Sequence, residues 1–260
     1  MHHAPSPRDN YDRIAHLYDV DMARNMPFDD IGLYVDQTER NGGRVLEAGC
    51  GNGRILLSLL ERSIDAIGID CSPGMLDELQ RKARERGMES PACLMDVRRL
   101  AFKQCFETVL CPYSLITYMS GAGDRERMLD GVFRTLIPDG LVLVDAFIPH
   151  SSAYQSQFAL DYRRPLGEVF LMRSKRVVAV APGINRVERR YELTTADGAV
   201  MQRIDTRVDV RPLSPDDLVS VLEERGFEIE REWWDYGART SPESAQYYTV
   251  SARRPAAARR

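Results

Sequence analysis

Two patterns of hydrophobic positions alternate along the first 150 residues. Short apolar runs typical of buried strands are separated by segments in which apolar positions follow helical spacing. Strands that alternate with helices are joined by right-handed crossovers, so this region is predicted to form a parallel sheet. The expected strands are Val45–Ala48, Ile64–Asp70, Ala92–Val97, Thr108–Tyr113 and Gly140–Phe147, and the expected helices between them are Ile55–Leu60, Pro73–Arg86 and Arg125–Leu136.

The alternation stops after residue 150. Val169–Val180, Arg186–Thr195 and Val200–Val210 follow one another as strands, separated by short turns that contain glycine. Consecutive strands with short turns form antiparallel meanders. We therefore expect an inserted antiparallel sheet that lies over the main one.

The two ends of the chain complete the organisation. Helices are expected over Asn10–Val20 and Phe28–Thr38, and over Ser214–Arg225, where Ser214 is a suitable N-cap. Phe227–Trp234 and Gln246–Arg253 are expected to close the fold as an antiparallel pair. The predicted fold class is α/β, with a seven-stranded, mainly parallel sheet whose last strand is antiparallel. The expected divisions are an N-terminal helical arm (1–43), a core (44–150), an inserted sheet on the acceptor side (151–212), a return to the core (213–254) and a disordered tail (255–260).

Composition narrows the class of protein. The chain has 260 residues, a formal net charge of −4 and 43% hydrophobic residues, which is ordinary for a soluble globular protein. No run is long enough to span a membrane, and the first ten residues lack the apolar core of a signal peptide. The five cysteines have no CxxC spacing, which favours reduced thiols and a cytoplasmic protein. Mild acidity argues against a nucleic-acid partner.

A glycine-rich loop carries the clearest chemical signal. The segment from Val45 to Arg54 reads as a strand that enters a loop with glycine at positions 49, 51 and 53 and then opens a helix. Such glycines let a ligand approach the backbone closely. Asp70 ends the next expected strand, where a carboxylate can accept hydrogen bonds from both ribose hydroxyls of an adenosine.

NAD and S-adenosylmethionine (SAM) both contain an adenosine. Two residues of the sequence distinguish between these cofactors. Arg54 stands where the dinucleotide fingerprint needs glycine, and Glu47 precedes the loop. A carboxylate repels a pyrophosphate but suits the ammonium and sulfonium groups of SAM. The alternative for Glu47 is a strand-end acid paired with an arginine. Arg54 itself either contacts the SAM carboxylate or only covers the loop.

At these residues the sequence resembles class I SAM-dependent methyltransferases. Glu47-x-Gly49-x-Gly51-x-Gly53 resembles their motif I, and Asp70 matches the ribose-binding acid. Asp96 matches the acid that contacts the adenine amino group, with the alternative that it caps a turn at the strand end. The resemblance implies a Rossmann-like core and SAM as cofactor, with S-adenosylhomocysteine as product. Met75 is equally explained as a core methionine on its helix. The cofactor-binding residues that the resemblance implies are Glu47, Gly49, Gly51, Gly53, Asp70, Cys71, Met75, Asp96, Val97 and Cys111.

The methyl acceptor is expected between the arm, the segment after the fourth strand and the inserted sheet. Tyr11 and Tyr18 are seven positions apart, so both lie on one face of the expected arm helix. Tyr11 is a candidate for acceptor binding, but an aromatic stripe that docks the helix on the core explains it better. The resemblance supports Tyr18 as a lid with a catalytic role, and this arm resembles that of small-molecule, amino-sugar N-methyltransferases. Tyr113, Tyr118 and Trp234 are further candidates for acceptor binding, although packing is the default for the tryptophan.

Base catalysis has one candidate. His150 lies three residues after the fifth expected strand, and its alternative is an ordinary loop histidine. Methyl transfer needs no base where a neutral amine or an electron-rich carbon is held in line. Asp145 has no Asp-Asn pair beside it, so no metal is predicted. The arginines of the insert form a solvated face, or else bind a carboxylate or phosphate of the acceptor.

The sequence thus predicts a SAM-dependent methyltransferase (EC 2.1.1 class). It would act by in-line displacement on a nitrogen or carbon, less readily an oxygen, of a small biosynthetic acceptor. Cys111-Pro112-Tyr113-Ser114 departs from the Asn/Asp-Pro-Pro-Tyr pattern of enzymes that methylate nucleic bases or glutamine. The alternatives are a SAM fold with a non-methylating activity and an NAD(P)-dependent oxidoreductase. An exposed edge of the inserted sheet would allow a homodimer.

Overall fold

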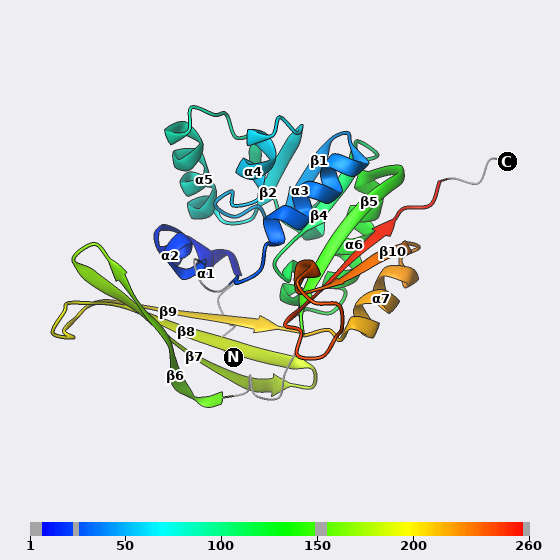
Figure 1. Ribbon diagram of the computed structural model, residues 1–260. Helices are drawn as coiled ribbons and strands as arrows, with labels where there is room; N and C mark the ends of the chain where they lie inside the picture. The colour runs from blue at the N-terminus through cyan, green and yellow to red at the C-terminus, as the bar shows by residue number, and fades with distance from the viewer. Residues whose placement is uncertain (1–6, 23–25, 149–154, 257–260) are drawn as a thin grey trace.

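A seven-stranded sheet forms the centre of the protein, as a computed structural model of residues 7–22, 26–148 and 155–256 shows (Figure 1). The strand order is β10-β11-β5-β4-β1-β2-β3. β11 pairs antiparallel with both of its neighbours, whereas β5, β4, β1, β2 and β3 pair in parallel. The predicted α/β sheet with an antiparallel last strand is confirmed. The strands are β1 (Val45–Ala48), β2 (Ala66–Asp70), β3 (Ala92–Leu94), β4 (Phe106–Cys111), β5 (Leu136–Phe147), β10 (Glu228–Trp234) and β11 (Tyr247–Arg253).

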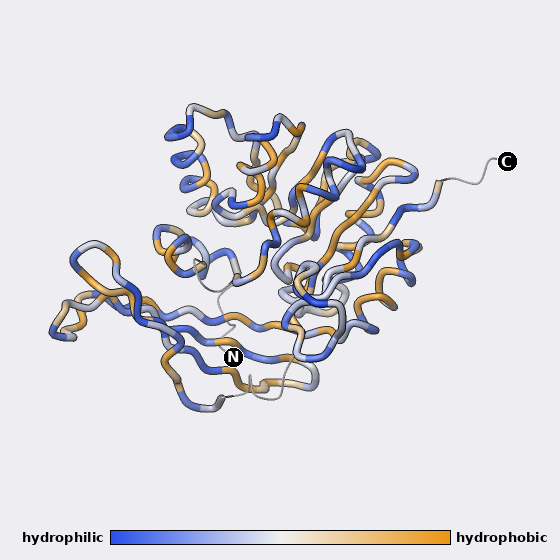
Figure 2. The backbone as a smooth tube through the Cα atoms, in the orientation of Figure 1, coloured by the Kyte–Doolittle hydropathy of each residue, from blue (hydrophilic) through white to orange (hydrophobic). Residues whose placement is uncertain are grey.

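Helices cover both faces of this sheet. α3, α4 and α5 pack on one face, where Tyr34, Leu57 and Leu79 meet alternate strand residues such as Val45 and Leu143. α6 and α7 pack on the other face in a second apolar cluster. The helices are α3 (Asp30–Asn41), α4 (Leu56–Glu61), α5 (Pro73–Glu85), α6 (Asp124–Thr135) and α7 (Pro215–Glu224), with short 3-10 turns η2 (Val97–Arg99), η3 (Leu115–Tyr118) and η5 (Asp235–Gly237). Hydrophobic stretches follow the strands of this sheet in Figure 2.

A second sheet of four antiparallel strands lies beside the core, with the order β6-β7-β8-β9. Only three of these strands were expected, and the additional one is β6. Its sequence mixes Gln, Asp, Arg and Pro without a clear alternation, because an edge strand pairs on one side only and buries few side chains. The strands are β6 (Gln155–Leu166), β7 (Val169–Ala181), β8 (Ile184–Thr194) and β9 (Val200–Val210).

The N-terminal arm lies between the two sheets (Figure 1). One helix was expected over residues 10–20, but the chain forms α1 (Pro7–Ile14), η1 (Ala15–Leu17) and α2 (Tyr18–Met22). The break follows from Ile14, whose backbone leaves the helical region at φ −115° and ψ 6°. This turn places Ile14 and Leu17 against Leu171, Tyr191 and Ile204 of the second sheet.

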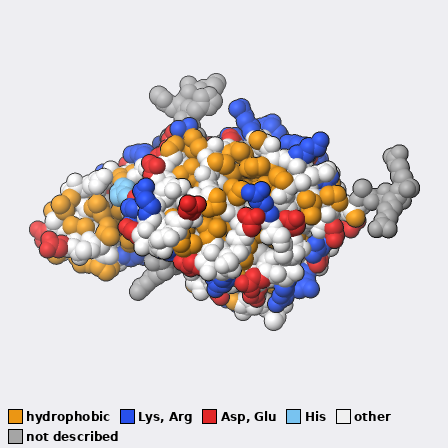
Figure 3. Space-filling model, turned by 90° about the horizontal axis from the view of Figure 1, so that it is seen from above, with side chains coloured by type: hydrophobic (Ala, Val, Ile, Leu, Met, Phe, Trp, Pro, Cys, Tyr) orange, Lys and Arg blue, Asp and Glu red, His pale blue; other side chains and the backbone are white. Residues whose placement is uncertain are grey.

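The outer face of the second sheet carries paired charges. Arg203 pairs with Glu192 at 2.6 Å and Arg190 with Asp205 at 3.0 Å, each across neighbouring strands. On the face of the molecule seen in Figure 3, acidic and basic side chains are interleaved rather than sorted by sign. None of the described helices is long and apolar enough to cross a membrane.

Candidate active site

A cavity of about 630 Å³ opens at the carboxyl ends of the parallel strands, between the central sheet, the arm and β9. This edge is where ligands bind in open α/β sheets. Its wall is continuous from the glycine loop to a group of tyrosines. The lining residues are Arg8, Tyr11, Tyr18, Gly49, Gly51, Asp70, Cys71, Met75, Leu94, Met95, Asp96, Val97, Arg98, Pro112, Tyr113, Leu115, Tyr118, Met119, Ser120, Asp124, Val208 and Asp209.

The glycine loop forms one end of the cavity. Gly49 and Gly51 have φ values of +73° and +52°, a region that side chains rarely adopt, and both line the wall. Gly53 does not line the cavity. A Cβ there would lie 2.1 Å from Leu79 Cδ1, so Gly53 lets α5 pack closely against the loop and lies behind the cavity wall.

Asp70 lies beside the loop at the end of β2. Its Oδ2 accepts a hydrogen bond from the Gly51 amide at 2.9 Å, and its Oδ1 accepts one from the Ser72 amide at 2.8 Å. Burial raises the pKa of Asp70 against these hydrogen bonds. Each carboxylate oxygen can accept a second hydrogen bond, and the residue lines the cavity. Asp70 is therefore held in place and keeps capacity for ligand hydroxyls.

Glu47 lies one layer behind the loop. Its side chain is 2% exposed, and its Oε2 atom has no hydrogen-bond partner among the described residues. Burial raises its pKa to about 8, although Arg54 and the Leu56 amide act in the opposite direction. A buried acceptor without a partner is costly. This orphaned oxygen fits a cofactor that brings a cationic donor to the loop, as the ammonium group of SAM would.

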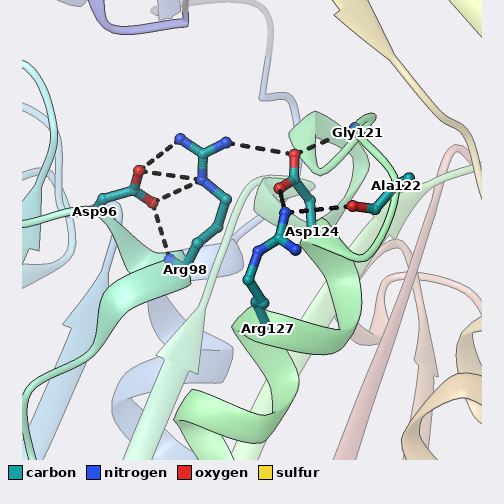
Figure 4. Close-up of polar contacts among 6 residues, drawn as sticks. All are labelled: Asp96, Arg98, Gly121, Ala122, Asp124 and Arg127. Atoms are coloured by element: carbon teal, nitrogen blue, oxygen red, sulfur yellow. Dashed lines mark hydrogen bonds and ion pairs between the residues drawn. The ribbon is translucent and has the colours of Figure 1, made fainter.

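Asp96 and Arg98 form the opposite side of the cofactor end (Figure 4). The Arg98 guanidinium and backbone amide donate to Asp96, at 2.5 Å from Nη2 to Oδ2 and 2.9 Å from the amide to Oδ1. Arg98 Nη1 also lies 3.4 Å from Asp124 Oδ2, at the start of α6. Hydrogen bonding by Arg98 lowers the pKa of Asp96, which stays ionised. Arg98 thus fixes the carboxylate that the resemblance assigns to the adenine.

Acidic residues of the arm attach it to the cofactor end. Asp12 Oδ1 accepts hydrogen bonds from Ser72 Oγ at 2.6 Å and from the Gly74 amide at 2.8 Å. Asp19 Oδ1 accepts one from Asn52 Nδ2 at 2.8 Å.

Asp30, at the start of α3, pairs with Arg54 at 2.5 Å, so the Arg54 guanidinium is held by a carboxylate of the protein itself. The glycine loop and the start of α5 are therefore clamped by the segments that precede β1.

Four tyrosines form the other end of the cavity. The hydroxyl oxygens of Tyr11 and Tyr118 are 2.8 Å apart, which joins the arm to the segment after β4. The rings of Tyr11 and Tyr18 meet edge to face with centroids 6.0 Å apart. Burial raises the pKa of Tyr11, Tyr18 and Tyr113, so all three are neutral hydroxyls near neutral pH.

The buried carboxylate of Asp145 stabilises the acceptor end of the cavity through hydrogen bonds. Its Oδ2 accepts hydrogen bonds from the Tyr113 amide at 2.9 Å, Tyr34 at 2.5 Å and Tyr236 at 2.8 Å, and its Oδ1 accepts one from the Ser114 amide. Tyr113 and Ser114 have positive φ values of 54° and 58°. The buried carboxylate stabilises a turn that directs Tyr113 to the cavity.

The other candidates differ in position. Cys71, Met75 and Val97 line the cavity, whereas Cys111 is buried in the core behind it. Trp234 is not part of the lining: its ring packs on Tyr248, with centroids 4.8 Å apart, because it belongs to the core layer next to α7.

Two further expectations concern a base and a metal. His150 lies outside the described residues. No group of three His, Cys, Asp or Glu within the described residues could hold a metal ion.

Sequence reasoning missed several lining residues. Leu94 is 55% exposed at the end of β3 and offers an apolar surface next to Asp96. Its position two residues before Asp96 puts both on one face of the strand end, which was an available signal. Arg8, Asp124 and Val208 reach the cavity from the arm, α6 and β9. They come together only through tertiary packing.

Part of the chain is similar in sequence to known methyltransferases. Residues 45–140 match the family of methyltransferase domains. The aklanonic acid methyltransferase of Streptomyces is 32% identical over 126 residues, which are 46% of this chain and 54% of that protein. The chain spans about half the length of the curated relatives it matches.

Solved structures are similar over nearly the whole chain. A SAM-dependent methyltransferase from Clostridium acetobutylicum has a TM-score of 0.76 at 17% identity, covering 94% of this chain and 99% of its own. The SAM-bound amino pentose methyltransferase from Micromonospora echinaspora has a TM-score of 0.68 at 16% identity, covering 90% and 96%. These likenesses show the fold. Residues 45–140 match a methyltransferase domain, for which SAM is the cofactor, and over most of its length the chain has the fold of class I SAM-dependent methyltransferases.

Proposed function

We propose that the protein transfers the methyl group of SAM to a nitrogen or carbon atom of a small organic acceptor. One observation carries the proposal. A single cavity has, at one end, the glycine loop with Asp70 and, at the other, a wall of four tyrosines. Cofactor and acceptor would therefore meet within one cavity.

The residues have distinct roles in this proposal. Asp70 would bind the ribose hydroxyls and Asp96 the adenine amino group, while the orphaned oxygen of Glu47 would receive the ammonium group. SAM supplies an electrophilic methyl group, which the acceptor takes by in-line displacement with S-adenosylhomocysteine as the product. Alignment of the two reactants in a closed site supplies much of the rate acceleration in such reactions, on the order of 7–11 kcal/mol.

The acceptor end supports a small molecule. Tyr11 and Tyr118 close the cavity through their hydrogen bond, so a large folded substrate would have to displace the arm. Tyr18 stays protonated because burial raises its pKa, so it would act as a wall and hydrogen-bond donor rather than as a base. The aklanonic acid relative supports a biosynthetic acceptor with an organic scaffold.

A second use of SAM is favoured by another group of relatives. Two matching proteins are named carboxy-S-adenosyl-L-methionine synthases, at 25% and 26% identity. Such a protein would consume SAM without releasing S-adenosylhomocysteine.

The test is mass spectrometry of reactions that contain SAM and a panel of small amines, amino sugars, indoles and phenols. The expected result is S-adenosylhomocysteine together with a product heavier by one methyl group. Fragmentation of that product would identify the methylated atom. Binding of SAM without S-adenosylhomocysteine or a methylated product from any panel member would contradict the proposal and favour the second use.

A further inference from the structure

The inner face of the four-stranded sheet carries four cationic side chains, and three of them have polar partners within the protein. Arg173 lies 2.5 Å from Asp21 and 2.9 Å from Asp161, and Lys175 lies 3.5 Å from the same Asp161. Arg164 donates to the Asp21 carbonyl at 2.6 Å. The protein thus supplies a partner to each of these charges.

Arg189 is the exception on this face. Within residues 7–22, 26–148 and 155–256 its guanidinium makes no hydrogen bond and no ion pair, although the side chain is partly buried. It shares a strand face with Tyr191, which is 2% exposed and donates to Asp21 at 3.2 Å. Asp21 acts on this guanidinium electrostatically but makes no ion pair with it, so its N–H donors stay available to an anionic ligand.

Arg189 lies beside the acceptor end of the cavity, although it is not one of the lining residues. In the sheet register it lies opposite Thr206, and Val208, two residues further along β9 on the same face, lines the cavity. The guanidinium is also within electrostatic range of the hydroxyls of Tyr11 and Tyr118, which line the same wall. Asp70 lines the cofactor end of the same cavity.

We propose that the acceptor carries a carboxylate or phosphate group, which Arg189 binds while the atom to be methylated points toward the cofactor end. The planar guanidinium matches the paired oxygens of either anion. The Tyr11 and Tyr118 hydroxyls would donate or accept at the edge of the same group. This inference rests on the proposed function and names the class of its substrate.

Anion binding is tested first, with probes that do not require turnover. The thermal midpoint of the protein saturated with S-adenosylhomocysteine is measured against inorganic phosphate, acetate and, as a neutral match for acetate, acetamide. We expect phosphate or acetate to raise the midpoint in the wild type and in Arg189→Lys but not in Arg189→Gln. Arg203→Gln, which removes an outer-face arginine paired with Glu192, is the matched control and should keep the shift.

Matched acceptors then distinguish the two anions. Glycine is compared with glycinamide for the carboxylate, and phosphoethanolamine with ethanolamine for the phosphate, as competitors of probe binding and as methyl acceptors. Loss of the Arg189 charge should weaken binding of the anionic member about 10- to 100-fold, as expected for a charged hydrogen-bonded contact.

The outcomes separate the inference from the proposed function. If S-adenosylhomocysteine binds in calorimetry but phosphate and acetate shift Arg189→Gln as much as the wild type, the anion site is wrong and the proposed function stands. If S-adenosylhomocysteine does not bind, the proposed function fails, and the anion shift without cofactor still decides the role of Arg189. Equal competition by the neutral and anionic members would also overturn the inference.

Discussion

The backbone amide of Tyr113 donates a hydrogen bond of 2.9 Å to Oδ2 of Asp145, a carboxylate that is fully buried under the acceptor end of the cavity. Four donors converge on this one side chain, two amides of the left-handed turn and two tyrosine hydroxyls. An isolated acid in the sequence is thus the support of the turn that carries Tyr113.

Asp145→Asn tests this support. An amide offers one acceptor oxygen and turns an NH₂ group toward donors, so we expect a loss of about 2–4 kcal/mol of stability. Denaturant unfolding measures it. Asp36→Asn, at an exposed position paired with Arg40, is the control and should change stability little. Equal effects of the two substitutions would show that Asp145 does not hold the turn.

Glu47→Gln should raise the stability of the protein and lower its affinity for the cofactor. The folded pKa is about 8 against an ordinary value of 4.5, so between these values the folded state holds a proton that the unfolded state releases. The free energy of unfolding therefore falls as pH rises through this window and then levels off. The neutral amide avoids that loss, so the variant should be more stable than the wild type above pH 8, by about 1–3 kcal/mol.

The same residue predicts a pH dependence of cofactor affinity. A bound ammonium favours the ionised carboxyl, so wild-type affinity for S-adenosylhomocysteine should rise from about pH 6 to about pH 8. Calorimetry across this range measures it together with the proton released on binding. In Glu47→Gln the affinity should be lower and should lose this dependence. An unchanged pH profile in the variant would assign the titration to another group.

Arg98→Gln tests whether Arg98 positions Asp96. Without the guanidinium, the Asp96 carboxylate loses its main donor and its link to Asp124, so we expect affinity for S-adenosylhomocysteine to fall about 3- to 10-fold. Arg127→Gln removes another arginine on Asp124 that does not contact Asp96 and serves as control (Figure 4). Affinity for an analogue that lacks the adenine amino group should fall less, because Arg98 acts through Asp96.

The Tyr11–Tyr118 hydrogen bond is predicted to keep the arm closed over the acceptor. Phenylalanine at either position removes the bond while keeping the ring, and a double-mutant cycle should give a coupling of about 0.5–1.5 kcal/mol in acceptor binding. Affinity for S-adenosylhomocysteine should stay close to the wild-type value. Additive effects of the two substitutions would mean that the hydroxyls act independently.

The local pattern of the sequence predicted most of the core because it depends on neighbours in the chain. Apolar runs that alternate with helices specify a parallel sheet, and the glycine loop with Asp70 after the next strand specifies where an adenosine fits. The strand β6 was not predicted, because an edge strand buries too few side chains to show a hydrophobic alternation. Gly53 was assigned to the ligand because glycines that allow helix packing look the same in sequence as those that face a ligand.

Charge partnership is what only the tertiary structure decided. The sequence has many arginines in the insert and several acidic residues in the arm. It does not show which of them form ion pairs. The fold pairs Arg54 with Asp30 and Arg173 with Asp21. It leaves Arg189 without an ion pair or hydrogen bond among the described residues, and one oxygen of Glu47 without a partner. Hydrophobic period is read along the chain, whereas electrostatic partners are set by distances of a few ångströms between segments far apart in it, and those distances exist only once the chain has folded.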